Sequence, residues 1–522
     1  MVNRHIEAII VTLLYFICLY FWILPIQGNS FPYGEVDAAS HFAIADYTTS
    51  TNKPITILPF YIDKRYGRDN AYKNHRLWYH PPYHMAFSIA QIISNDRITS
   101  VFFANAIFSS LIVLSVYFII RKLFGFLPAF LSSFMLIFSM RDIMVYLWGQ
   151  WPERMGFAYL PLVIYCFYKY SLSYLHKKEK PIYLYLTSLL LVCNLFVHPM
   201  TFIHTILTLL IFSFLLLIKE KKLFFSIRHL LISVILFILI VSIFPLQTLN
   251  VIVRLKSNKY DKAEPNSFSR LFRWTGGLNA EGSVPNAYFS YKDMIGGYWT
   301  IPLIILGILV ILLRRNNKTV IIFSWLIGLY IMIHLDVIGI SGRVHRSLSA
   351  TAHIFYPLVA IGLLSLVSYA KYFGIYKKYV KYGVILVFLV LFINSNGKAA
   401  YLQLKNAYSG IIRVTPYQLE VSEWIKDNIP EKAQIPSFGA LTQAKSRWIW
   451  MLSHRYVPYI QSFSDKRMVN ATHILLDYSD RAIIGDKKTI AYMQDWERKN
   501  LANATLLYNK NYIKVYKIGN QI

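Results

Sequence analysis

The stretch YGEVDAASH, residues 33–41, follows an apolar run that ends near Ile26. Its two carboxylates, Glu35 and Asp37, therefore stand where a hydrophobic helix would leave a bilayer. A carboxylate at that depth is costly to hold without a partner. The two acids are thus either solvated loop residues or helix caps, or they belong to a site at the membrane surface.

The composition is that of a polytopic membrane protein. Of the 522 residues, 56% are hydrophobic, and the mean hydropathy is +0.41. The formal net charge is +28, which in a soluble protein would fit nucleic-acid binding. Here the basic residues cluster in short loops between apolar runs, so we interpret the charge as a determinant of membrane orientation. All three cysteines lie inside apolar runs, which predicts neither a disulfide framework nor a cysteine metal site.

The apolar runs predict an all-α transmembrane domain over residues 1–396, with about eleven spans. Basic connections alternate with longer ones of mixed charge, including a large first loop over 27–98. By the positive-inside rule, the N-terminus and the basic connections face the cytoplasm and the longer connections face outward. This topology predicts a multi-pass protein of the plasma membrane. The predicted spans are residues 6–26, 99–120, 125–141, 155–172, 181–197, 199–218, 225–247, 298–313, 318–335, 346–370 and 380–395.

The tail, residues 397–522, predicts a small soluble α/β domain on the extracytoplasmic side. TPYQ at 415–418 is a capping box with proline at the first helical position, so a helix should begin there. The stretch 471–478 predicts a buried strand. Residues 506–518 predict a hairpin that turns at 509–511.

Polar residues gather in three of the predicted outer segments. In the first loop, Asp37 and His41 share a face if the segment is helical, and WYHPPYH at 78–84 leads into a helix expected at the outer interface, over 82–93. The other segments are MRDIMVYLWGQWPERMG at 140–156 and SGRVHRS at 341–347. The candidate site residues are Glu35, Asp37, His41, Tyr79, His80, Asp142, Gln150, Glu153, Arg343, His345 and Arg346.

These residue types fit a phosphorylated lipid donor and a hydroxyl acceptor, because acids accept a proton from a hydroxyl and arginines hold phosphate with paired hydrogen bonds. Plainer interpretations stay open. An Arg-His-Arg stretch outside a membrane is more often a headgroup contact than a catalytic clamp. Hydrogen bonding in a packed loop explains His80 and His84 better than metal binding does. We expect His198 and His204, at an outer turn, to be structural.

The layout resembles the GT-C superfamily of integral-membrane glycosyltransferases, which includes protein O-mannosyltransferases and oligosaccharyltransferase catalytic subunits. A narrower resemblance is to prokaryotic membrane proteins labelled "6-pyruvoyl-tetrahydropterin synthase-related", and nothing in the chain indicates pterin chemistry. The stretches that carry the resemblance are GEVDAASH (34–41), WYHPPYH (78–84), RKLFG (121–125), GQWPE (149–153) and TPYQLEVSEWIKDNIPEKAQI (415–435).

The resemblance implies a sugar donor on a polyprenyl phosphate or diphosphate and a reaction that inverts the anomeric centre. Asp37 occupies the family's acid position and would be the general base or would orient the acceptor. Glu35 is grouped with it as a catalytic candidate. The GGYWT string at 296–300 lacks the acid of the sequon-reading WWDYG-type motif. This departure favours transfer of single sugars to a glycan, lipid or protein over en bloc transfer to asparagine.

The resemblance also implies roles for the later outer segments. Arg343 and Arg346, with His345 between them, would hold the lipid phosphate. Asp142 and Glu153 would be second-site acids. No cofactor is certain, and a divalent metal, Mg²⁺ or Mn²⁺, is left open.

Two other functions stay open. A flippase or transporter of lipid-linked sugars predicts inverted repeats and polar groups along a path through the bilayer, but we find no repeat. A non-catalytic scaffold would explain the outer domain but not the acids and arginines. For the enzyme, Asp37, His80, Glu153 and Arg343 should converge on one outward cavity. No nucleic-acid partner is expected.

Overall fold

The chain divides into two compact units. Unit 1 comprises Met1–Leu24, Ala106–Tyr146 and Trp151–Lys405, and unit 2 comprises Pro25–Asn105, Leu147–Gln150 and Asn406–Ile522. This division differs from the predicted one at residue 397, because the first loop packs with the tail. The computed structural model describes residues 3–27, 32–33, 36–53, 55, 57–66, 77, 79–257, 295–314, 316–334, 347, 350–406, 413–440 and 442–518.

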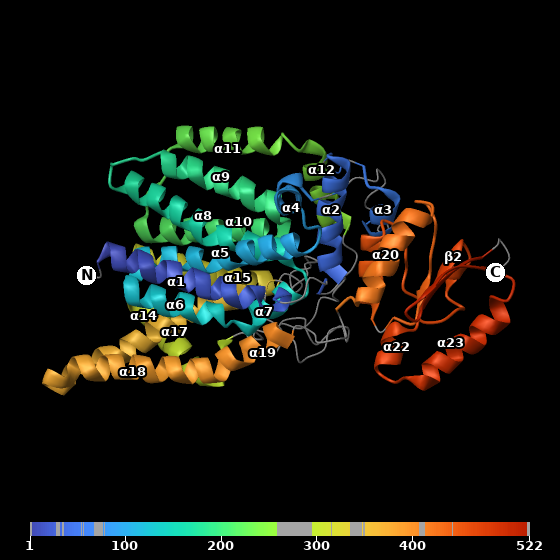
Figure 1. Cartoon of the computed structure of the whole chain (residues 1–522). Coiled ribbons are helices and arrows are strands. Elements are labelled where there is room, and N and C mark those ends of the chain that lie inside the picture. Colours follow the sequence, from blue (N-terminus) through green and yellow to red (C-terminus); the bar gives the residue numbers. More distant parts are fainter. Residues whose placement is uncertain are drawn as a thin grey trace. The chain divides into compact units, whose positions relative to one another are not determined.

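Unit 1 is built from apolar helices, and each of the eleven predicted spans overlaps a helix. The helices wholly or largely in this unit are α1 (Arg4–Ile23), α5 (Thr99–Phe124), α6 (Phe126–Ile137), α7 (Met140–Leu147), α8 (Trp151–Leu175), α9 (Ile182–Val197), α10 (Pro199–Glu220), α11 (Ile227–Val241), α12 (Pro245–Ser257), α14 (Ile301–Arg314), α15 (Asn317–Ile333), α17 (Thr351–Ser368), α18 (Lys377–Phe392) and α19 (Lys398–Asn406), with a 3₁₀ segment, η8 (Tyr369–Tyr376), before α18. Figure 1 shows α1, α5, α8, α9 and α10 running roughly along one direction.

The helices identify a membrane protein. Within the described ranges, four helices are long and apolar enough to cross a membrane, or up to six if each of two bent pairs forms one span. The predicted count of eleven stays a prediction, because α9, α14 and α15 are shorter than a typical span. The predicted span at 225–247 is not one straight helix, since α11 and α12 meet at an angle of 101°.

Glycines allow close helix packing in unit 1. A Cβ on Gly307 of α14 would lie 2.2 Å from the carbonyl oxygen of Leu358, and a Cβ on Gly362 of α17 would lie 2.0 Å from that of Leu303. The two backbones therefore touch at both glycines. Small residues at such contacts are typical of helices that associate in lipid, where van der Waals packing replaces the hydrophobic effect.

Unit 2 combines the first loop with the tail. Its helices are α2 (Val36–Thr51), α3 (Phe60–Tyr66), α4 (Pro81–Ser94), α20 (Pro416–Asn428), α21 (Gln443–Leu452), α22 (Ser479–Ile483) and α23 (Lys487–Asn500). The strands β1 (Ser437–Phe438), β2 (His473–Asp477), β3 (Thr505–Lys510) and β4 (Ile513–Lys517) form one sheet in the order β1-β2-β4-β3. β1 is parallel to β2, and the other pairs are antiparallel. The predicted helices over 82–93 and from 415 are confirmed, and Thr415 and Gln418 form the capping box.

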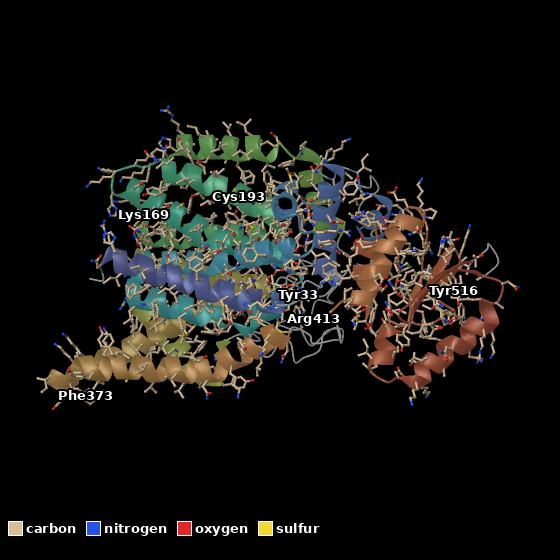
Figure 2. All side chains as sticks on the ribbon, viewed as in Figure 1. Tyr33, Lys169, Cys193, Phe373, Arg413 and Tyr516 are labelled. Atoms are coloured by element: carbon tan, nitrogen blue, oxygen red, sulfur yellow. The ribbon has the colours of Figure 1, made fainter. Side chains whose placement is uncertain are left out.

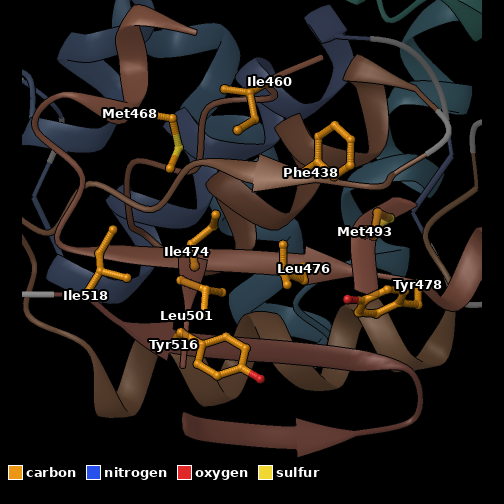
Figure 3. Packing of buried hydrophobic residues seen from close by; sticks show 10 residues of the cluster. All are labelled: Phe438, Ile460, Met468, Ile474, Leu476, Tyr478, Met493, Leu501, Tyr516 and Ile518. Atoms are coloured by element: carbon orange, nitrogen blue, oxygen red, sulfur yellow. The ribbon is translucent and has the colours of Figure 1, made fainter. Parts of the chain in front are cut away.

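The core of the tail lies between the sheet and α23. The side chains of Ile474 and Leu476 from the predicted strand are fully buried there and pack in one cluster with Phe438 and Met493 (Figure 3). The predicted hairpin over 506–518 is found at residues 505–517, but its turn lies later than the predicted 509–511. Its turn is at Asn511 and Tyr512, which both have positive φ, as a tight two-residue hairpin turn requires.

Candidate functional site

Asp37 lies in the first turn of α2, where its carboxylate is half-buried. A negative charge is favoured there by the partial positive charge of the helix N-terminus. Residues 38–46 are all buried, because α2 packs against both α4 and α21. His41 follows one turn later, so the predicted shared face is confirmed. The half-exposed acid is thus attached to a helix whose next turns are fixed in the core of unit 2.

An aromatic and imidazole cluster surrounds His41. Its Nδ1 lies 3.0 Å from Nε2 of His84, and its ring contacts that of Tyr79 edge-on at a centroid distance of 5.1 Å. Tyr79 also contacts His84 at 5.2 Å. The three side chains are buried. His84 is thus buried and hydrogen-bonded, as predicted, but it lies in α4 and not in a loop.

His80 stands at the N-cap of α4 and is buried. Burial lowers the pKa of its imidazole to about 4, because the charged form is poorly solvated there. His80 is therefore neutral at physiological pH. Among the described residues, no group of three or more His, Cys, Asp or Glu side chains is arranged to hold a metal ion.

Gly149 connects the second predicted segment to α2. It has a φ of +84°, and a Cβ placed on it would lie 2.1 Å from the backbone nitrogen of Ala38. Only glycine fits this approach without displacing the first turn of α2. The following residue, Gln150, has a buried side-chain oxygen that lacks a hydrogen-bond donor among the described residues. The structure thus brings Gly149, which precedes Gln150, to the residue next to Asp37.

The acid of α7, Asp142, is buried in unit 1 and already paired. Its Oδ1 forms an ion pair with Arg154 and lies 2.9 Å from Nε2 of His353. Arg154 also donates to the carbonyl oxygen of Ser109 at 3.3 Å and lies over the ring of Trp22 at 4.6 Å. Both side chains of the Asp142–Arg154 pair are 1% exposed. The pair therefore balances charge inside the membrane unit, as buried ionisable groups there require.

A second pair of opposite charges lies close by along the chain. Glu153, in the first turn of α8, interacts electrostatically with Arg141 of α7. Both are buried. His204 and His353 each pack edge-on against Phe157, at centroid distances of 5.7 and 5.6 Å. The structural role of His204 stays a prediction.

The predicted site residues are thus distributed over both units. Asp37, His41, Tyr79, His80 and Gln150 belong to unit 2, and Asp142 and Glu153 belong to unit 1. Four predicted site residues lie outside the described residues: Glu35, Arg343, His345 and Arg346. The predicted convergence on one cavity stays a prediction.

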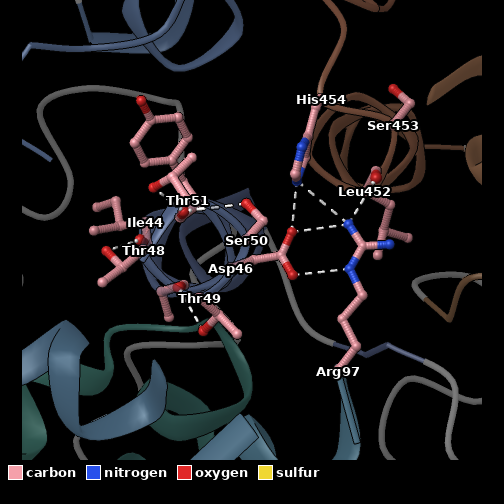
Figure 4. Close-up of polar contacts among 12 residues, drawn as sticks. Ile44, Asp46, Thr48, Thr49, Ser50, Thr51, Arg97, Leu452, Ser453 and His454 are labelled. Atoms are coloured by element: carbon pink, nitrogen blue, oxygen red, sulfur yellow. Dashed lines mark hydrogen bonds and ion pairs between the residues drawn. The ribbon is translucent and has the colours of Figure 1, made fainter. Parts of the chain in front are cut away.

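Sequence reasoning missed a charged network that fixes α2 in unit 2. The Asp46 carboxylate accepts two hydrogen bonds of 2.8 Å from Arg97 and lies 2.6 Å from Nε2 of His454 (Figure 4). Arg97 also pairs with Glu423 of α20. Burial raises the pKa of Asp46, but the hydrogen bonds from Arg97 and His454 outweigh this effect and hold the pKa below its usual range. The only signal was an acid in the first loop, nine residues after Asp37, without a partner nearby in sequence.

The fold is GT-C-like, as the comparison with solved structures shows. The structure is similar to that of the archaeal oligosaccharyltransferase AglB from Archaeoglobus fulgidus in complex with an inhibitory peptide and a dolichol-phosphate. The TM-score is 0.59 and the sequence identity is 13%, and the match covers 99% of this chain and 75% of that chain. It is also similar to ArnT from Cupriavidus metallidurans in the apo state, with a TM-score of 0.57 and 10% identity over 98% of each chain. For ArnT bound to undecaprenyl phosphate, the TM-score is 0.53 at 10% identity over 97% of each chain.

At these identities the likeness establishes the fold. The model of a family of unknown function, DUF6541, matches residues 6–435, and the chain belongs to this family. No curated protein matches the sequence. The narrower resemblance to the pterin-synthase-related membrane proteins stays a prediction.

Proposed function

We propose that this protein is a membrane glycosyltransferase that takes a sugar from a polyprenyl-phosphate donor and transfers it to a hydroxyl of a glycan, lipid or protein at the outer membrane face. The observation that carries the proposal is the position of Asp37, half-exposed in the first turn of α2 and soon after α1, in a GT-C-like fold. Two structures of that fold hold dolichol-phosphate and undecaprenyl phosphate, which supports a polyprenyl-phosphate donor.

Asp37 would act as the general base. The acceptor oxygen forms a bond to the anomeric carbon, the bond from that carbon to the donor phosphate oxygen breaks, and the acceptor proton passes to the carboxylate. A single displacement of this kind inverts the anomeric centre. Asp37 suits the role because it combines solvent access with a fixed position, since the residues after it are buried against α4 and α21. The lipid phosphate would be held by Arg343 and Arg346.

The paired acids of unit 1 have a different proposed role. Asp142 is held by Arg154 and His353, so its negative charge is already compensated and it is poorly suited to remove a proton from an acceptor. We assign it to positioning α7 against α8 and α17. Glu153 also interacts with a buried arginine, Arg141. We keep it as the candidate second-site acid because it lies in the first turn of α8, three residues after Gln150.

The first experiment measures transfer of radiolabelled sugar, and hydrolysis of the donor, with purified protein and a panel of polyprenyl-phosphate and polyprenyl-diphosphate sugars. Asp37→Ala and Asp37→Asn should lower the rate by about 10²–10⁴-fold, the usual contribution of a positioned general base. Melting temperature should stay unchanged, since the carboxylate is half-exposed.

Asp63→Ala is the matched control, because Asp63 occupies the first turn of α3 in the same unit. It should retain the wild-type rate. Full activity of Asp37→Asn would remove Asp37 from the mechanism. Failure of the wild-type protein to bind any labelled donor would reject the glycosyltransferase itself.

A further inference from the structure

A pocket of about 350 Å³ opens in unit 1, between the ends of five helices. The helices α5, α14 and α17 end beside it, and α6 and α18 begin there. Its lining residues are Phe124, Leu127, Pro128, Arg314, Ile361, Leu364, Ser365, Val367, Ser368 and Lys381. These ends correspond to the basic connections that the sequence places on the cytoplasmic side, so the pocket is separate from the proposed transfer site.

The lining combines apolar walls with two cations. Arg314 ends α14 and Lys381 lies in α18, and neither forms an ion pair within the described part of the chain. Two hydroxyls, of Ser365 and Ser368, complete the polar edge, while no acid lines the pocket. The N-terminal turn of α6, which contributes Leu127, adds partial positive charge. The pocket therefore offers uncompensated positive charge beside an apolar wall.

The surrounding sequence strengthens this positive potential. The basic connections that border the pocket, residues 314–318 and 371–381, contain seven Lys and Arg residues and no acid. An anion at the pocket is thus attracted by the local field as well as by direct contacts. An ammonium headgroup, as in phosphatidylcholine, would find no carboxylate to pair with in the lining.

Exposed aromatic residues and lysines next to the pocket indicate headgroup depth. Tyr372, Phe373, Tyr376 and Tyr379 are exposed in η8 and the first turn of α18, and Figure 2 shows Phe373 at the tip of this turn. Lys371, Lys377 and Lys378 alternate with them. Tyrosines and long cationic side chains are enriched where a membrane protein meets the membrane–water interface.

We propose that this pocket binds the phosphate headgroup of an anionic phospholipid of the cytoplasmic leaflet, with Arg314 and Lys381 holding the phosphate and the apolar wall contacting the glycerol and upper acyl chains. Basic pockets between transmembrane helices on the cytoplasmic side are suited to anionic headgroups. The site does not depend on the proposed transferase activity. A bound lipid would hold the ends of α14, α17 and α18 together, so the stability of their packing would depend on the lipid composition of the membrane.

The test uses the full chain in detergent, titrated with phosphatidylglycerol or phosphatidylcholine, with bound lipid counted by native mass spectrometry and stability followed by thermal unfolding. The wild type should bind phosphatidylglycerol in preference to phosphatidylcholine and unfold at a higher temperature with it. Arg314→Gln with Lys381→Gln should bind phosphatidylglycerol about 30-fold more weakly, given the usual contribution of each cation near an anionic lipid. Arg314→Lys with Lys381→Arg should bind like the wild type.

Lys377→Gln with Lys378→Gln is the matched control, because it removes the same charge from residues that do not line the pocket. It should weaken binding less than twofold. If this control lost as much affinity for phosphatidylglycerol as the Arg314/Lys381 variant, the lipid would be attracted by the charged surface in general, and the proposal would be overturned. Equal binding of the two lipids by the wild type, or unchanged binding by the Arg314/Lys381 variant, would also overturn it. If inorganic phosphate raised the unfolding temperature as much as phosphatidylglycerol does, the ligand of the pocket would be a soluble anion and not a lipid, and the proposal would be wrong.

Discussion

At the scale of single residues, a few positions carry interactions that a substitution cannot replace. Asp142 is shared by Arg154 and His353 in the interior of unit 1, and Gly149 touches the backbone of Ala38 in unit 2. The first is an electrostatic constraint, since the charge of a buried arginine must be balanced. The second is a steric constraint on the turn that carries Asp37.

Asp142→Ala should lower the free energy of unfolding by about 3–5 kcal/mol, because it leaves Arg154 buried without its acid. Thermal unfolding of the purified protein measures this change. Replacing both partners, as Asp142→Ala with Arg154→Met, should recover a large part of the loss, since no unpaired charge remains. A double variant as unstable as the single one would show that the pair acts through packing and not through charge.

Gly149→Ala should reduce transferase activity by about 100-fold, the effect expected for a displacement near 1 Å at a catalytic group. The new Cβ forces the first turn of α2 away from its position, and Asp37 moves with it. Gly125→Ala separates this crowding from backbone strain, because Gly125 also has a positive φ but open space around its Cβ. Equal activity of the two variants would contradict the steric argument.

At the scale of elements, α2 is the helix on which unit 2 is organised. It packs against α4 from the first loop and against α21 from the tail. The hydrogen bonds of Asp46 with Arg97 and His454 join the same three parts of the chain. Ser88 of α4 adds a hydrogen bond to the carbonyl oxygen of Ala45. The orientation of the helix that begins with Asp37 therefore depends on the tail as well as on the loop.

This network predicts a loss of stability in acid. Burial lowers the pKa of His454 in spite of Asp46, so the unfolded chain binds a proton more readily as pH falls below about 6.5. The lowered pKa of Asp46 also makes the folded state less stable in acid. The stability that this carboxylate contributes is lost as the pH falls below about 4. Melting temperature should therefore fall between pH 7 and 4, and His454→Gln should reduce that slope. If the melting temperature of His454→Gln changed with pH as steeply as that of the wild type above pH 4.5, His454 would not be the cause of the acid sensitivity.

At the scale of the whole molecule, the composition of unit 2 limits the topology. Its three chain segments form one compact body, so the first loop, residues 147–150 and the tail must share one side of a membrane. Between the first two segments, α5 would supply one crossing away, and the bent pair α6–α7 the return if it forms one span. The predicted eight spans after residue 151 are also an even number, which agrees with this requirement.

Cysteine labelling tests the topology directly. In a variant without Cys18, Cys166 and Cys193, single cysteines replace the exposed Asn52 of the first loop, Lys488 of the tail and Lys178 of a basic connection. A membrane-impermeant maleimide should label the first two on intact cells and Lys178→Cys only after permeabilisation. Labelling of Asn52→Cys and Lys488→Cys from opposite sides would contradict unit 2 as one body, and the reverse pattern for all three would invert the predicted orientation.

Local sequence patterns were sufficient to predict the apolar helices of unit 1, the helix over 82–93, the capped start of α20, the buried strand β2 and the shared face of Asp37 and His41. These features depend on local periodicity, on capping side chains and on the thickness of a bilayer. Only the tertiary structure decided that the first loop packs with the tail, that Gly149 lies against Ala38, and that Asp46 binds a histidine 408 residues away. Such contacts leave no local signal, because each partner satisfies the rules of its own segment and the pairing is set by how the segments pack.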